Sequence, residues 1–140
     1  MPSELTGEWF ENWTVQLRKG VLDLCILEAL AGGEWYGYAL VKALVAIPGL
    51  GVAEGSMYPL LSRLRKQGLV TTRLEESTEG PARKYYRLTA EGRRHAAAMG
   101  EHFGRMVSGL EQLRRGGGAG AGGAASAGAM EGSTNRETTG

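Results

Sequence analysis

The apolar residues of this chain change their spacing at Gly68, and this change limits the possible folds more than any other feature. Before Gly68 they recur every three or four residues, which places them on one face of an α-helix. Between Gly68 and Thr89, β-branched and aromatic residues fill two short runs, as is typical of β-strands. The sequence therefore predicts helices first and a small amount of sheet second.

Three helices are predicted before Gly68, each followed by glycine or proline. They cover residues 17–31, 36–47 and 54–67. In the third helix the apolar residues share one face, and they are Met57, Leu60, Leu61 and Leu64. Pro59 lies inside this range. Because proline removes a hydrogen bond from a helix interior, we expect the third helix to start late or to bend there.

The two predicted strands, residues 69–75 and 82–89, are joined by a turn-like cluster that contains Gly80 and Pro81, which indicates a β-hairpin. Thr89 then opens a last helix, whose apolar residues alternate at spacings of three and four. This heptad seam consists of Ala96, Met99, Phe103, Met106, Leu110 and Leu113. Since the preceding elements already make one core, we expect the seam to pack against a second copy of the chain.

This layout predicts a mainly α fold with a small β-hairpin, namely a winged helix-turn-helix followed by a C-terminal dimerisation helix. The segments are an N-terminal segment (1–16), the winged helix-turn-helix domain (17–89), the dimerisation helix (90–115) and a tail (116–140). The tail holds nine Gly and six Ala and has no aromatic residue. It has too little apolar surface to offset the entropy of ordering, so we expect it to be disordered.

Positive charge is concentrated around the third helix and the hairpin. Residues 54–94 hold nine Lys and Arg against five acids, in a chain whose net charge is only +1. A local basic region of this kind indicates a phosphate-binding surface. In a winged helix, the third helix enters the major groove of DNA and the wing contacts the backbone or the minor groove.

We therefore predict that the chain binds double-stranded DNA. Arg63 is the candidate for a bidentate contact to guanine, and hydroxyl groups and other cations would contact bases or phosphates. The predicted DNA-binding residues are Ser56, Tyr58, Ser62, Arg63, Lys66, Arg83, Lys84 and Arg87.

Four stretches occur in an order and at separations that resemble the PadR family of transcriptional regulators. They are residues 36–40 (YGYAL), 55–64 (GSMYPLLSRL), 68–70 (GLV) and 80–89 (GPARKYYRLT). The resemblance extends from residue 17 to residue 113 and fits the compact branch of the family, which has a single C-terminal helix. It implies a repressor that binds inverted repeats as a homodimer and releases DNA when a small aromatic effector binds at the dimer interface. Candidate effector-binding residues are Trp9, Trp13 and Phe103.

Several residues allow two interpretations. Trp9 and Trp13 either line an effector pocket or clasp the partner subunit, or else they cover the core or the C-terminal helix. Cys25 is either a small buried hydrophobe or a redox sensor, which would need an accessible thiol of low pKa. Tyr85 and Tyr86 are expected on opposite faces of a strand, one of them in the core, rather than as a stacking platform for single-stranded nucleic acid.

Two other classes of function are less well supported. An enzyme is disfavoured because His95 and His102 have no third ligand for zinc and no nucleophile motif is present, so we expect no cofactor and no metal. A winged helix that binds a protein or only a ligand would not need Arg63, Lys66 and the wing cations together. The sequence has no run long enough to span a bilayer and no secretory signal, so we expect a cytoplasmic protein without membrane contact.

Overall fold

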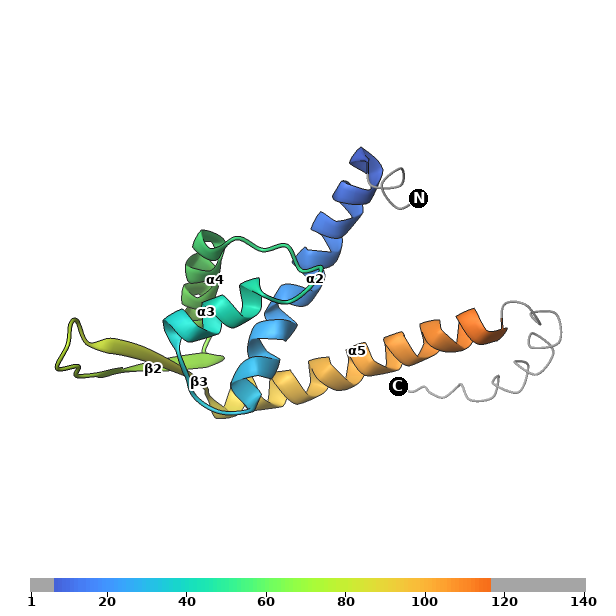
Figure 1. Ribbon diagram of the computed structural model, residues 1–140. Coiled ribbons are helices and arrows are strands. Elements are labelled where there is room, and N and C mark those ends of the chain that lie inside the picture. Colours follow the sequence, from blue (N-terminus) through green and yellow to red (C-terminus); the bar gives the residue numbers. More distant parts are fainter. Residues whose placement is uncertain (1–6, 117–140) are drawn as a thin grey trace. The chain divides into compact units, whose positions relative to one another are not determined.

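The computed structural model describes residues 7–116, and Figure 1 shows how their helices and strands are arranged. In chain order the elements are α2 (Glu8–Ala31), β1 (Trp35–Tyr36), α3 (Gly37–Val45), α4 (Glu54–Lys66), β2 (Val70–Glu75), β3 (Arg83–Leu88) and α5 (Ala90–Gly116). Mainly helical structure with a small antiparallel sheet confirms the predicted fold class. The chain forms two compact units, the first ending at Gly100 and the second beginning at Glu101. The predicted disordered tail lies, apart from Gly116, outside the described residues.

Helix α2 begins at Glu8, whereas the apolar stripe predicted a helix only from residue 17. The residues before 17 face mostly solvent, so no stripe of core residues marks this part of the helix in the sequence. Glu8 and Glu11 lie in its first turn, where negative charge favours the positive end of the helix dipole. The predicted boundary at residue 16 is therefore not a structural boundary.

The sheet has three antiparallel strands in the order β1-β3-β2, and the hairpin of β2 and β3 projects from the helices as a wing (Figure 1). Only two strands were predicted. The third, β1, pairs just Trp35 with Tyr86 and Tyr36 with Tyr85, which is too short to leave an alternating pattern. The indole nitrogen of Trp35 donates a hydrogen bond of 3.1 Å to the carbonyl of Ala29 and so ties β1 to the end of α2.

The core lies among α2, α3, α4 and the sheet, and the first part of α5 closes it. Its most deeply buried residues are Ile26, Leu27, Leu30, Leu40, Val41, Met57, Leu61 and Leu64. Ala96 is also buried in this core, and Met99 packs against it. The prediction that Ala96 faces a second chain is thus corrected, whereas the half-buried Met99 stays a candidate for the seam. Both residues lie in the first compact unit, which ends at Gly100.

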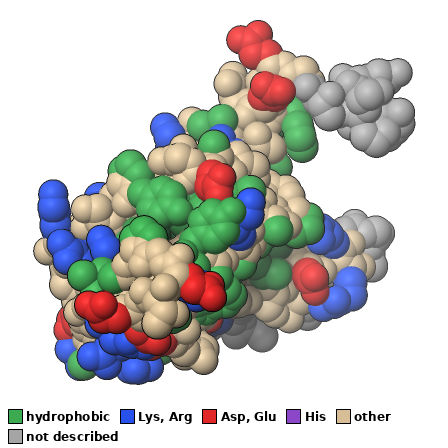
Figure 2. All heavy atoms as spheres, turned by 60° about the vertical axis from the view of Figure 1, so that its left-hand side comes forward, with side chains coloured by type: hydrophobic (Ala, Val, Ile, Leu, Met, Phe, Trp, Pro, Cys, Tyr) green, Lys and Arg blue, Asp and Glu red, His purple; other side chains and the backbone are tan. Residues whose placement is uncertain are grey.

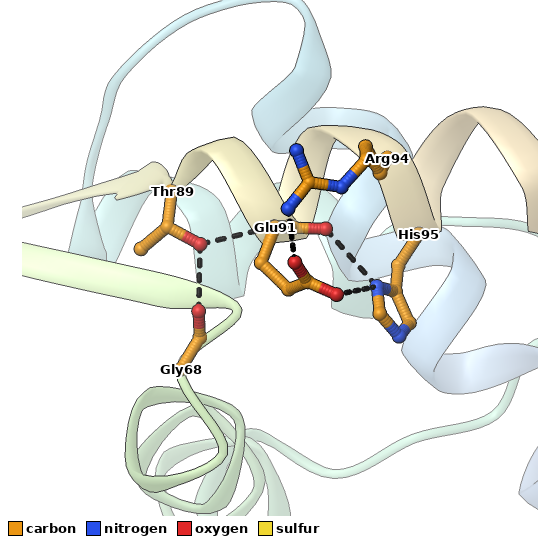
Figure 3. Close-up of polar contacts among 6 residues, drawn as sticks. Gly68, Thr89, Glu91, Arg94 and His95 are labelled. Carbon is orange, nitrogen blue, oxygen red and sulfur yellow. Dashed lines mark hydrogen bonds and ion pairs between the residues drawn. The ribbon is translucent and has the colours of Figure 1, made fainter.

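The junction between the sheet and α5 depends on Thr89, which Figure 3 shows beside Gly68, and on Gly92. The Thr89 hydroxyl donates a hydrogen bond of 2.6 Å to the Gly68 carbonyl and accepts one of 3.0 Å from the Gly92 amide, which confirms that Thr89 opens the helix. In the first turn Glu91 pairs with Arg94. A β-carbon at position 92 would collide with the carbonyl oxygen of Leu69, so only glycine allows α5 to approach the start of β2.

We expect Gly92→Ala to lower the free energy of unfolding by about 1–3 kcal/mol, because backbone must move to accommodate the methyl group. Gly20→Ala is the control. Gly20 lies in the interior of exposed α2 with no atom near its missing β-carbon, so alanine should gain about 0.5–1 kcal/mol there. Urea denaturation of both variants measures the difference. Equal stabilities for the two variants would contradict the close approach at Gly92.

Candidate nucleic-acid interface

Three buried side chains fix the rotation of helix α4 about its axis. Met57, Leu61 and Leu64 are at most 1% exposed. The helix begins at Glu54 and includes Pro59, so it does not start late, and its buried face compensates for the hydrogen bond that proline removes. Because a helix repeats every 3.6 residues, the other side faces solvent. Four predicted DNA-binding residues are exposed there, namely Ser56, Tyr58, Ser62 and Lys66.

Arg63, the predicted guanine contact, is also exposed on α4, seven residues after Ser56, but its side chain extends to α2. Its guanidinium donates hydrogen bonds of 2.9 and 3.2 Å to the two carboxylate oxygens of Asp23 on α2, and one of 3.4 Å to Gln67. A contact from Arg63 to a base would first have to break the pair with Asp23. The pair joins α4 to α2 in the chain by itself, and the contact of Arg63 with guanine stays a prediction.

The residues of β3 alternate between the two faces of the sheet. Tyr86 and Leu88 point into the core, and Lys84 lies on the same face, toward α4. Tyr85 is half-buried on the opposite face, which confirms that the two tyrosines point in opposite directions and excludes a two-tyrosine stacking platform. Among the predicted wing residues, Lys84 therefore lies on the α4 side. Arg83 lies near Tyr36 and also lines the hollow that Tyr58 of α4 and Lys84 line, and Arg87 lies on the outer face.

The outer face of the wing carries a row of stacked cations and aromatic rings. Arg73 donates two hydrogen bonds of 2.8 Å to the Glu34 carboxylate and lies 4.6 Å from the centre of the Tyr85 ring. The Tyr85 ring is 5.8 Å from that of Tyr36, and Arg83 lies 5.0 Å from the centre of Tyr36. The hydrogen bonds from Arg73 lower the pKa of Glu34. Arg73 and Arg83 thus interact within the chain.

Figure 2 views the side of the molecule that carries the wing and shows Lys and Arg side chains gathered there, with acidic side chains among them. Arg65 is a further exposed cation on α4 that was not among the predicted DNA-binding residues. It is exposed on α4 two turns after Tyr58, and its charge acts on the Tyr86 hydroxyl. The spacing of seven residues from Tyr58 was the available signal, since it places both side chains on one face.

A cavity of about 540 Å³ lies between the wing and the first turns of α3 and α4. Tyr38, Tyr58, Lys84 and Tyr86 line it from these elements. Gly37 is required in its wall, because a β-carbon there would lie 2.8 Å from the ring carbon Cε1 of Tyr86. The cavity therefore has a rigid side, formed where α3 begins against β3.

Both ends of the described chain carry exposed apolar residues. Trp9 and Trp13 on α2 are 79% and 48% exposed, and neither belongs to the core of residues 7–116. The alternative that they cover the core is therefore wrong. In the second compact unit, the seam residues Met106 and Leu113 are 59% and 72% exposed, Leu110 is also exposed and Phe103 is half-buried.

Other candidate chemistry receives no support from the structure. Cys25 packs against the core, and burial raises the pKa of its thiol, which favours a structural role over a redox sensor. Within residues 7–116 no three His, Cys, Asp or Glu side chains are grouped so that they could hold a metal ion. The described helices are all too short or too polar to cross a membrane.

Residues 26–98 match the model of the transcriptional regulator PadR-like family. The chain is also similar to several solved structures. A PadR-like transcriptional regulator from Bacillus cereus is 38% identical with a TM-score of 0.65, and the match covers 72% of this chain and 98% of that chain. A PadR family transcriptional regulator from Eggerthella lenta is 31% identical with a TM-score of 0.64 (79% and 96% covered). A Streptococcus transcriptional regulator is 32% identical with a TM-score of 0.62 (71% and 97% covered). No curated protein gives a significant match.

The ion pair of Glu34 with Arg73 predicts a pH-dependent contribution to stability. Because the pKa of Glu34 is lowered from its ordinary value of 4.5 by folding, the pair stabilises the protein above that value and is lost as the pH falls through the folded pKa. We expect Glu34→Gln to lower the melting temperature at neutral pH and to make progressively less difference at acidic pH. Glu76→Gln, at a residue with no ion pair among those described, is the control for thermal unfolding followed by circular dichroism. A Glu34→Gln effect that stayed constant with pH would argue against the pair.

Proposed function

Since this chain belongs to the PadR-like family and is a DNA-binding transcription regulator rather than an enzyme, we propose that it represses promoters by binding an inverted repeat as a homodimer. A small aromatic effector would release it from DNA. The observation that carries the proposal is the exposed face of α4 beside the wing, because it combines hydroxyl groups and cations on one rigid surface.

We assign the DNA contacts to the side chains that share this surface. Lys66 and Arg65 would contact phosphates, and the hydroxyl groups would contact phosphates or bases. The assigned residues are Ser56, Tyr58, Ser62, Arg65, Lys66 and Lys84. Arg63 is left out because its guanidinium already pairs with Asp23.

The homodimer would form through the second compact unit. Four apolar residues of α5 keep the heptad spacing there, and they are half-buried or exposed, namely Phe103, Met106, Leu110 and Leu113. A helix with such a seam gains stability when it packs against an equivalent helix. A two-fold dimer would present two copies of α4 to two half-sites, which is why an inverted repeat is the expected operator.

Trp9 and Trp13 would bind the aromatic effector. Their indole rings are exposed on one side of α2, four residues apart, and Phe10 lies with its ring centre 5.8 Å from that of Trp13. Exposed aromatic rings of this kind offer flat surfaces on which another aromatic molecule can stack.

DNA binding is tested by fluorescence anisotropy with a mixed-sequence duplex at several salt concentrations. We expect Lys66→Ala to weaken binding and to reduce the salt slope by about one unit, because one phosphate contact is lost. Arg63→Ala removes the same charge from the same helix and should have a smaller effect, since Asp23 already binds it. An equal or larger loss of affinity in Arg63→Ala would indicate that Arg63 contacts DNA. Binding by the wild type that did not depend on salt would refute the proposed function.

The dimer is tested by sedimentation velocity. Leu110→Glu places like charges opposite each other in the proposed seam, so we expect it to produce monomers. Gln112→Glu adds the same charge two residues away, outside the seam, and should leave the dimer intact. If Leu110→Glu sedimented as a dimer, the seam would not be the interface.

A further inference from the structure

Helix α4 carries three cations, and one of them is already bound by another part of the chain. Arg63 pairs with Asp23 of α2, whereas Arg65 and Lys66 form no ion pair within residues 7–116. Asp23 likewise pairs with no other cation in this range. The carboxylate of Asp23 therefore occupies one positive charge of the helix to which we assign DNA contacts.

Arg63 is close to the surface of α4 that we assign to DNA. It lies three residues before Lys66 and seven residues after Ser56, and these spacings place side chains on neighbouring parts of one helix face. The Arg63 side chain is 46% exposed even while it is paired. A change of rotamer along this long side chain, without movement of the backbone, would bring its guanidinium to a ligand that contacts the same face.

The hydrogen bonds of the pair differ from the strongest contact that arginine makes with a carboxylate. That contact has two parallel hydrogen bonds from two nitrogens. Here Nη2 of Arg63 alone donates to both Asp23 oxygens, at 2.9 and 3.2 Å, and Nη1 donates to Gln67 at 3.4 Å. Since both partners are partly exposed, the pair shifts an equilibrium by about fivefold at most. Asp23 therefore holds Arg63 in a contact that another anion can replace.

A DNA duplex offers Arg63 acceptors of the kind that Asp23 offers. Phosphate oxygens carry negative charge, and guanine presents two acceptors in the major groove to which arginine can donate from two nitrogens. Because Nη2 of Arg63 is engaged by both Asp23 oxygens, a bidentate contact with DNA requires the guanidinium to leave the carboxylate. Each contact thus excludes the other.

We propose that Asp23 is an internal competitor of DNA, whose carboxylate holds Arg63 in the free protein and thereby lowers the affinity of α4 for a duplex. The proposal rests on the proposed function and adds to it a residue of α2 that sets how tightly DNA is bound from outside the assigned contact surface. A pair that served only to position α4 predicts the opposite sign, because its loss would disturb the helix and weaken binding.

The test measures the affinity of Asp23→Asn for a mixed-sequence duplex by fluorescence anisotropy across a salt series. Asparagine keeps the size of the side chain and removes its charge. We expect binding at low salt to be about two- to fivefold tighter than that of the wild type. The salt slope should be steeper by about one unit, because the released Arg63 neutralises one more phosphate.

Two further variants separate competition for Arg63 from a general effect of charge. Glu11→Gln removes one negative charge from an exposed residue of the same helix and should bind as the wild type does. In a chain that carries Arg63→Ala, Asp23 has lost its partner, so Asp23→Asn should give no gain in affinity there. All titrations are made below the unfolding transitions of the variants, which circular dichroism locates.

The possible failures are distinct. If the wild type bound no duplex at any salt concentration, the proposed function itself would fail. If the wild type bound duplex and Asp23→Asn bound it equally well or more weakly, only the competition would be rejected, and the pair would have a structural role. A gain of the same size in Glu11→Gln, or in Asp23→Asn combined with Arg63→Ala, would assign the effect to net charge and would also reject Asp23 as a competitor.

Discussion

Met57, Leu61 and Leu64 hold helix α4 in the core, and the arrangement of the candidate interface depends on this packing. Complete burial of such side chains contributes about 1.5–3 kcal/mol each, which is enough to keep a helix that contains Pro59 and has no side-chain cap. The same packing leaves the helix one possible rotation. It sends Arg63 toward Asp23 on one side and Tyr58 toward the wing on the other. The core therefore selects which polar side chains can meet a partner.

The sequence predicted the main helices, the hairpin and the exposed side of α4. These features depend on the spacing of apolar residues, which can be read from a short stretch of sequence without knowledge of the rest of the fold. The sequence could not predict the pairing of Arg63 with Asp23, which depends on two residues 40 positions apart. Strand β1 has only two residues and so has no period to detect. Ala96 and Phe103 share one heptad pattern, yet Ala96 is in the chain's own core. A heptad pattern predicts that a residue is buried, but it does not distinguish burial in the chain's own core from burial against a second chain.

The cations of the wing differ in what they are free to do. Arg73 is bound by two glutamates and Arg83 lies on a tyrosine ring, whereas Lys84 has no ion pair among the described residues. A count of charges along the sequence treats all three alike. Alternation along β3 contributes to this difference, since Arg83 and Tyr85 belong to one set of alternate positions and Lys84 and Tyr86 to the other. The local excess of positive charge therefore overstates the number of groups that can contact DNA.

The stacked row of Arg73, Tyr85, Tyr36 and Arg83 has a consequence for the kinetics of binding. It links all three strands through side chains, so the wing loses its conformational freedom when the chain folds rather than when it meets DNA. Binding to a preorganised wing therefore costs little further conformational entropy. Association should then be limited by diffusion and long-range charge attraction, and the lifetime of the complex should distinguish one DNA sequence from another.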